Sequence, residues 1–298
     1  MTSTTSTTPP PLSARPPARL LVRKLEIDLK RGFGRHWHGG DALRSQFFNA
    51  LSMSFPVGEQ FFIDSVRDAA RLLPDGPESA ALRETISGFV GQEATHRFIH
   101  GLYNAELERQ GLVNRWQHWA EARLARLRAR QPVADPRHAL AATCAFEHLT
   151  AVLADGTLRH PRWLEGAEPD MQTVWRWHAA EETEHNAVAF DLYRALGGGY
   201  RMRLRWYLYV CLTFLADATS QTLLNLHHDR SLWRPSTAWN AATLLFGRDG
   251  LAWRCARPLA DYLRPDFHPS QDRHPVPAQT LASRWLAVHA NLWRTVRG

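Results

Sequence analysis

The stretch WRWHAAEETEHNAVAFDLY, residues 175–193, decides the fold that this sequence predicts. It contains neither Gly nor Pro, so we expect a helix. Within it, Glu182 and His185 are three residues apart, and residues at that spacing are neighbours on one helix face. The stretch therefore predicts a helix that presents a carboxylate and an imidazole on the same side.

A second copy of this pattern lies upstream, as Glu93-x-x-His96 in FVGQEATHRFIHGLYNAEL. Two Glu-x-x-His helices, with a single Glu on each of two further helices, form the ligand set of a ferritin-like dinuclear metal site. The sequence offers Glu59, which lies 34 residues before Glu93, and Glu147, which lies 35 residues before Glu182. This spacing predicts two similar helical hairpins whose side chains meet in one bundle core.

The residue types fit a metal site of this kind. Carboxylates supply negative oxygen ligands and can bridge two cations about 3.5–4 Å apart. Two imidazoles beside them favour Fe or Mn over Ca or Mg, and the lack of Cys argues against a structural zinc site. We expect two metal ions, most readily Fe, with Mn or Zn as alternatives. The predicted ligands are Glu59, Glu93, His96, Glu147, Glu182 and His185.

Each of these residues also has an ordinary interpretation. A single Glu-x-x-His commonly lies on a solvated helix face, and Glu59 could be placed at a helix start, where the dipole favours a carboxylate. Glu147 carries more weight, because it lies in ALAATCAFEHLTAVLA, where an apolar helix has to compensate its charge.

Two further histidines lie one helical turn from predicted ligands, His100 after His96 and His178 before Glu182. We expect both to act in catalysis, as extra ligands or proton relays, and the alternative is a pair of hydrogen-bonded core histidines.

The neighbours of the motif glutamates have predicted roles of their own. Gln92 and Glu181 are expected to orient ligating imidazoles, and Glu184 is expected on a solvated face.

The remaining pattern is helical, and no stretch alternates as a strand does, so the fold class is all-α. The prediction is a ferritin-like four-helix bundle over residues 43–196, with 111–135 as the crossover and further C-terminal helices over 200–296. Residues 1–20, rich in Thr, Ser and Pro, are expected to be a disordered tail, and 21–298 a single metal-binding domain.

Pro56 and Gly58 are expected to interrupt the first helix. Helical segments are expected over 41–51, 59–73, 78–110, 112–130, 136–153, 170–196, 200–226, 236–246, 249–262 and 278–296.

Composition limits the cellular setting and the partners. The net charge is +7, but the arginines are spread through amphipathic helices, so we expect a solvated surface and no nucleic acid partner. The three cysteines form no CxxC and read as free thiols in a reducing, cytoplasmic compartment. No apolar signal segment begins the sequence, and no apolar stretch reaches the length of a spanning helix.

The segment 201–226 is an unusual helix. Arg201, Arg203 and Arg205 precede WYLYVCLTFL, which is apolar all round. A buried hairpin helix is the plain interpretation, and an interfacial helix on lipid headgroups is the alternative. We expect this helix, or its junction with 236–246, to border a channel to the metals on the side of His100 and His178, since an apolar substrate would enter there most easily. Peripheral membrane contact and a homodimer are both left open.

Several ordered segments resemble the bacterial "predicted metal-dependent hydrolase" family over roughly residues 22–275. They are FPVGEQFFIDSVR, GQEATHRFIHGLYN, FEHLTA, WHAAEETEHNAVAFDLY and YLRPDFHPSQD. The resemblance implies a metal-binding helical protein. By ligand pattern alone, the six predicted ligands are also similar to those of di-iron carboxylate oxidases and oxygenases.

Two reaction classes follow from this ligand set. The first, which the ligand types favour, is an O₂-dependent di-iron oxidase or oxygenase acting on an apolar organic substrate. The alternative is a two-metal hydrolase that uses a metal-bound hydroxide. A non-enzymatic metal-binding or purely structural bundle is the third interpretation. No P-loop, nucleophile elbow or H-E-x-x-H motif supports another chemistry.

Overall fold

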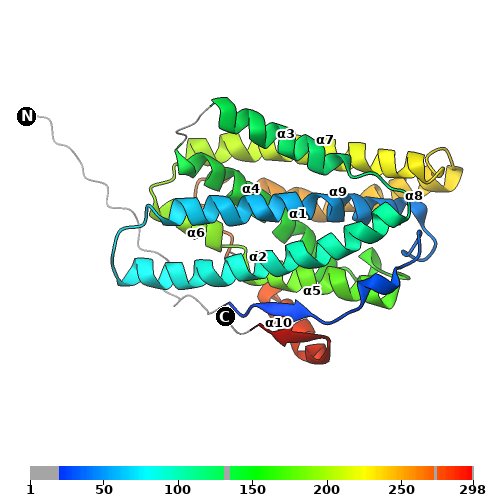
Figure 1. Cartoon of the computed structure of the whole chain (residues 1–298), viewed down its shortest axis with the longest axis horizontal. Helices are drawn as coiled ribbons and strands as arrows, with labels where there is room; N and C mark the ends of the chain where they lie inside the picture. The colour runs from blue at the N-terminus through cyan, green and yellow to red at the C-terminus, as the bar shows by residue number, and fades with distance from the viewer. Residues whose placement is uncertain (1–19, 131–134, 272–273, 297–298) are drawn as a thin grey trace, which may run out of the picture.

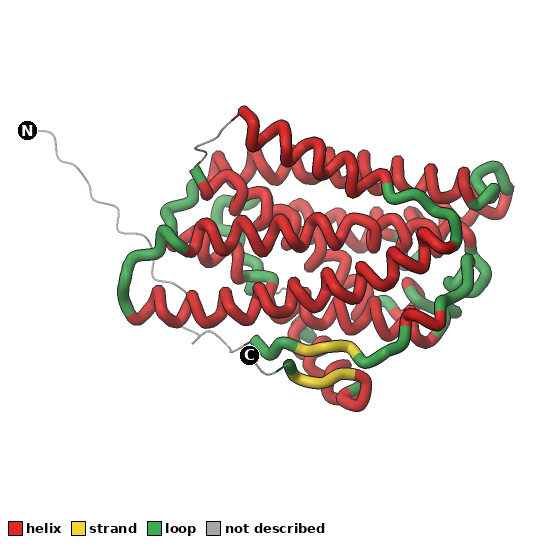
Figure 2. The backbone as a smooth tube through the Cα atoms, in the orientation of Figure 1, coloured by secondary structure: helices red, strands yellow, loops and turns green. Residues whose placement is uncertain are grey.

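The computed structural model describes residues 20–130, 135–271 and 274–296, and its regular secondary structure is helical apart from two short strands (Figures 1 and 2). The all-α prediction is confirmed. The predicted tail, except for Leu20, lies outside the described residues. The helices are α1 (Ala42–Ala70), α2 (Pro77–Arg109), α3 (Arg115–Arg130), α4 (Pro136–Arg159), α5 (Pro169–His185), α6 (Val188–Ala195), α7 (Tyr200–His228), α8 (Pro235–Phe246), α9 (Leu251–Asp261) and α10 (Ala278–Val288).

Two helical hairpins, α1–α2 and α4–α5, pack together to form the centre of the molecule (Figure 1). Helix α3 connects them along the outside, α6 continues the direction of α5, and α7 packs along α1 and α4. Asp41 caps α1 by accepting a hydrogen bond from the backbone N–H of Arg44. Asp135 caps α4 in the same way, with Pro136 in the first turn.

The predicted interruption at Pro56 is wrong, because α1 runs through it without a break. A proline inside a helix removes the hydrogen bond to the carbonyl four residues earlier and typically costs about 3 kcal/mol. Here that carbonyl belongs to Ser52, and the side-chain amide of Asn104 donates a hydrogen bond to it at 3.0 Å. A side chain of α2 therefore replaces the donor that Pro56 lacks.

Two other predicted helices end earlier than expected. The helix predicted over 170–196 is broken by a turn at Asn186 and Ala187, directly after His185, although no Gly or Pro marks the break. The helix predicted over 278–296 ends at Val288, and the chain then forms strand β2 (Trp293–Thr295). β2 pairs antiparallel with β1 (Arg23–Leu25), drawn in yellow in Figure 2. Strands of three residues are too short to show the alternation by which strands are recognised.

The hydrophobic core has two large clusters, and both draw on the same four-helix centre. One contains Met53 of α1, Tyr103 of α2 and Trp177 of α5. The other contains Phe62 of α1 and Phe89 of α2. In α1 and α2, which contribute to both clusters, the polar segments around Glu59 and around Glu93 and His96 lie between them. Among the described residues, no helix is both long and apolar enough to cross a membrane.

Candidate metal centre

The six predicted ligands come from four different helices and meet between the two hydrophobic clusters. Glu59 lies in α1, Glu93 and His96 in α2, Glu147 in α4, and Glu182 and His185 in α5. All six side chains are buried, with at most 3% of the residue exposed. Three overlapping groups, each with ligand atoms within 4.8 Å of one another, contain all six and one further residue, His178. The groups are Glu59–His96–His178, Glu93–Glu147–His185 and Glu93–His96–Glu182.

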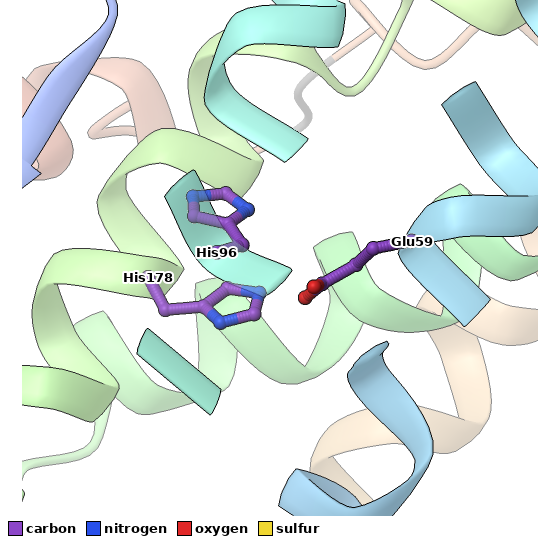
Figure 3. Close-up of side chains that lie close together, drawn as sticks. All are labelled: Glu59, His96 and His178. Atoms are coloured by element: carbon purple, nitrogen blue, oxygen red, sulfur yellow. The ribbon is translucent and has the colours of Figure 1, made fainter. Parts of the chain in front are cut away.

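Figure 3 shows the first of these groups, with the carboxylate of Glu59 pointing toward the rings of His96 and His178. Glu59 lies in the interior of α1, so the alternative that it sits at a helix start is wrong. The structure thus brings together residues that are up to 126 positions apart in the sequence (Glu59 to His185). Their role as ligands stays a prediction.

Polar atoms in this centre lack hydrogen bonds to an unusual degree. Both carboxylate oxygens of Glu59, Glu93 and Glu147 are buried without a hydrogen-bond partner, and so are single atoms of Glu182, His96 and His185. Buried polar groups in proteins are nearly always paired, since an unpaired group costs about 1–3 kcal/mol. Such a group of acceptor atoms, all aimed at one volume, fits cations as the missing partners.

Two of the imidazoles are held by partners on their outer nitrogens. The Nε2 atom of His96 lies 3.0 Å from a carboxylate oxygen of Glu181, so it carries the proton and donates it there. The Nδ1 atom of His185 donates to the amide oxygen of Gln92 at 2.9 Å. The inner nitrogen of each ring therefore faces the centre, as a metal ligand requires. Burial opposes the charged form of His185, but Glu182, Glu93 and Glu147 outweigh it and raise its pKa well above the ordinary value, so that a metal would displace a proton from this nitrogen. The orienting roles predicted for Glu181 and Gln92 match these contacts, although each holds the imidazole of the other hairpin.

A third imidazole, that of His178, is oriented by a longer chain of hydrogen bonds. The hydroxyl of Ser52 donates to the amide oxygen of Asn104 at 2.8 Å. Ser52 then accepts from Nδ1 of His100 at 2.9 Å, and Nε2 of His100 accepts from Nδ1 of His178 at 2.7 Å. This order of donors leaves Nε2 of His178 without a proton.

The free nitrogen of His178 lies 2.9 Å from a carboxylate oxygen of Glu182. Two lone pairs at this distance need a proton or a cation between them. His178 is therefore placed like a ligand, whereas His100 lies one step further out and touches His178 rather than the carboxylates. Of the two histidines for which the sequence predicts a catalytic role, His178 lies next to the carboxylates and His100 lies behind it.

Burial and mutual repulsion change the pKa values of the carboxylates. Burial raises the pKa of Glu59 and of Glu147 well above the ordinary value, and it raises that of Glu93 in spite of the contact with His185. Burial acts on Glu182 in the same direction, but His185 and His178 outweigh it and hold its pKa well below the usual range. Without a cation the four carboxylates cannot all be charged.

A buried arginine lies behind two of the imidazoles. Arg23 of β1 donates to Glu181 at 3.1 Å and to Glu184 at 2.7 Å, and Glu184 in turn accepts from the side-chain amide of Gln92 at 3.0 Å. Arg23 thus supports both residues that orient His96 and His185. The prediction that Glu184 faces solvent is wrong, because it is needed to pair with this guanidinium. Sequence patterns could not reveal these contacts, since Arg23 lies more than 150 residues from its partners.

An apolar pocket leads to the centre, with Glu182 and His178 among its lining residues. Its free volume is about 40 Å³, and aromatic and aliphatic side chains form nearly all of its wall. Phe214 of α7 and Leu244 of α8 line it. Helix α7 therefore borders this approach to His178, as expected for segment 201–226, whereas the lining includes no residue of the junction between 226 and 236. The wall also includes Phe48, Phe55, Leu153, Trp163, Trp175 and Leu251.

The fold and the site together define a class: an all-helical protein with buried Glu and His side chains placed to hold metal. The chain belongs to the family described as "Predicted metal-dependent hydrolase", which matches residues 21–273. The family resemblance seen in the sequence is therefore confirmed, and it supports metal dependence. A search of curated proteins and a search of solved structures found no match, and the ferritin-like comparison stays a prediction.

Proposed function

We propose that this protein is a hydrolase that uses two metal ions, held by the four glutamates together with His96, His185 and His178. The observation that carries the proposal is the convergence of unpaired carboxylate oxygens and three imidazole rings on one buried volume. The family description supports hydrolysis better than oxidation, which reverses the order that the sequence analysis gave to the two reactions.

Bound metal ions would supply Lewis-acid activation of a water molecule and of the substrate oxygen. The protein's own part is to fix the ligands beforehand. Glu181 and Gln92 hold two imidazoles in the ligating tautomer, and the chain through His100 and Ser52 does the same for His178. Because these partners are themselves buried, the inner ring nitrogens are aimed at the centre before a metal arrives.

The pocket indicates an apolar substrate. Its polar lining atoms come chiefly from His178, Glu182, Thr150 and Thr157, while Phe, Leu and Trp side chains make up the rest. A small free volume between aromatic rings suits a narrow acyl or alkyl chain whose reacting end reaches His178 and Glu182. The apolar wall also excludes bulk water, so that only water held at the centre would be near the reacting bond.

O₂-dependent oxidation of an apolar substrate is the second candidate, and one observation favours it. The donor set consists of carboxylates and imidazoles with no thiolate, a combination that suits Fe, and it lies at the end of an apolar pocket.

An assay of metal-loaded protein separates the two reactions. The protein would be loaded with Mn, Zn or Fe under anaerobic conditions and offered p-nitrophenyl acetate, butyrate and octanoate. Hydrolysis that needs metal, needs no O₂ and favours the longer acyl chain is the expected result. The variant Glu93→Gln should lose it, while Glu108→Gln, an exposed glutamate on the same helix, should keep it.

Metal-bound protein that leaves every ester intact but consumes O₂ when loaded with Fe would overturn hydrolysis in favour of oxidation. Metal-bound protein that does neither would overturn both enzymatic proposals and indicate a binding protein.

A further inference from the structure

Four large aromatic side chains are exposed on a short helical hairpin. The hairpin consists of the end of the loop that follows α7, helix α8 and helix α9. We call residues 233–257 the aromatic hairpin. Its exposed residues are Trp233, Trp239, Phe246 and Trp253, with 90%, 71%, 59% and 64% of the residue exposed. Folded proteins rarely leave so many large apolar groups in water within one small segment, and when they do the surface usually contacts a partner or a membrane.

The hairpin is a built structure rather than a loose loop. The indole N–H of Trp253 donates to the carbonyl of Phe246 at 3.1 Å, and the two rings lie 5.9 Å apart. The start of α9 is thereby fixed to the end of α8. Helix α8 buries Leu244 and Thr237 while Trp239 and Phe246 point outward, so its two sides differ sharply.

The charge around these rings is positive. The aromatic hairpin contains four arginines and a single acidic residue, Asp249, which pairs with Arg254 at 2.7 Å. Arg234, Arg248 and Arg257 are exposed beside the aromatic side chains. Indole rings with arginines around them are the composition found where a protein lies in the headgroup region of an anionic bilayer.

The inner side of the same hairpin lines the apolar pocket. Leu244 of α8 and Leu251 of α9 belong to the pocket wall, together with Phe214 of α7. The next outward residues of α7, Leu212 and Leu215, are 72% and 66% exposed and extend the apolar surface. The approach to His178 and Glu182 therefore runs under the aromatic hairpin.

We propose that the aromatic hairpin docks on an anionic membrane surface, with its tryptophans among the headgroups, and brings the pocket next to the lipid. It lies on the membrane and does not span it, since no described helix is suited to crossing one. A second copy of this chain fits the surface less well, because pairing two such faces would bring two sets of arginines together. The proposal extends the predicted contact of segment 201–226 to α8 and α9, and it does not depend on the reaction.

Vesicle co-sedimentation of the full chain tests the proposal. The probes are vesicles of phosphatidylcholine alone and of phosphatidylcholine with phosphatidylglycerol, at low and at physiological ionic strength. We expect binding to the anionic vesicles that weakens with salt. The double variant Trp233→Ser/Trp239→Ser should weaken this binding roughly tenfold or more. It removes two aromatic rings that the proposal places in the bilayer interface. Arg234→Gln/Arg248→Gln should weaken it and flatten its salt dependence.

The matched control is Phe98→Ser/Val288→Ser, which removes two exposed apolar residues, 53% and 76% exposed, from α2 and α10. It should bind as the parent does. Absence of binding to anionic vesicles would overturn the proposal, and so would equal losses in the control and the tryptophan variant. A dimer in sedimentation velocity that the tryptophan variant dissociates, without vesicle binding, would assign the face to a second copy instead.

Discussion

The three imidazoles at the candidate centre differ in the partner held by the outer nitrogen of each ring. His96 donates to a carboxylate and His185 to an amide, whereas His178 donates to another histidine. A histidine between His178 and Ser52 can pass a proton along the chain, because an imidazole can accept at one nitrogen as it donates from the other. The amide of Gln92, by contrast, takes up no proton and can only hold its imidazole in place.

This difference gives a prediction for His178 and His100. Because His178 faces the carboxylates directly, His178→Ala should remove a ligand and lower metal affinity more than His100→Ala does. His100→Ala removes only the orienting contact and should weaken binding about 10–100-fold. Isothermal titration with Mn or Fe under anaerobic conditions measures both.

His118→Ala is the control, since this residue is exposed on α3. Equal, unchanged affinities in the two site variants would show that neither histidine serves the metal, and a larger loss for His100→Ala would reverse their order.

The sequence predicted the six converging residues and missed most of what supports them. Glu-x-x-His pairs are visible because one helix turn joins their members, and Glu147 is visible because its neighbours are apolar. Ser52, Asn104 and Arg23 have no such signal, since each meets its partner only through tertiary packing. Gln92 and Glu181 were found because they adjoin motif residues, but their cross-hairpin pairing was not.

At the scale of elements, α1 depends on α2 at Pro56. The amide of Asn104 satisfies the Ser52 carbonyl that the proline leaves free, and the same two residues begin the hydrogen-bond chain to His178. The proline therefore couples the continuity of a helix to the orientation of a candidate ligand. A helix rule applied to the sequence alone could only read Pro56 as a break.

We expect a measurable coupling between positions 56 and 104. Asn104→Leu should lower the free energy of unfolding by about 1–3 kcal/mol, because a buried carbonyl loses its donor. In a Pro56→Ala background, residue 56 has a backbone N–H that can donate to the Ser52 carbonyl. Asn104→Leu should then lower the free energy of unfolding by a smaller amount, with a difference of at least about 0.5 kcal/mol. Urea unfolding of the two single variants and the double variant supplies the cycle. Strictly additive losses would show that Asn104 does not replace the missing donor.

The ribbon β1–β2 joins segments from the two ends of the described chain and carries Arg23 to the back of the centre. Arg23→Gln should therefore weaken metal binding about 10–100-fold, as loss of an orienting group commonly does, although Arg23 touches no predicted ligand. Arg31→Gln, an exposed residue that pairs with Asp28, is the control and should not change affinity. Affinity in Arg23→Gln equal to that of the control would limit this arginine to a structural role.

At the scale of the whole molecule, the two hydrophobic clusters do not need the centre between them. Their helices bury Phe62, Phe89, Tyr103 and Trp177 in apolar clusters, and apolar burial stabilises a fold without metal. We expect chelator-treated protein to keep its far-UV helical signal at room temperature. Metal should raise the melting temperature only because it binds the folded protein and not the unfolded chain. Loss of the helical signal on chelation would show that the metals hold the fold together.

The most direct test of the account is the number of metal ions bound per chain, measured by elemental analysis after anaerobic loading and desalting. The account predicts two ions in the parent and in the surface variant Glu108→Gln. It predicts at least one fewer in Glu147→Gln, with helical content unchanged, because the amide keeps the size of the side chain and removes the charge that faces His185. A parent protein that retains no metal, or a Glu147→Gln variant that retains as much as the parent, would contradict the central claim that these buried glutamates and histidines form a metal centre.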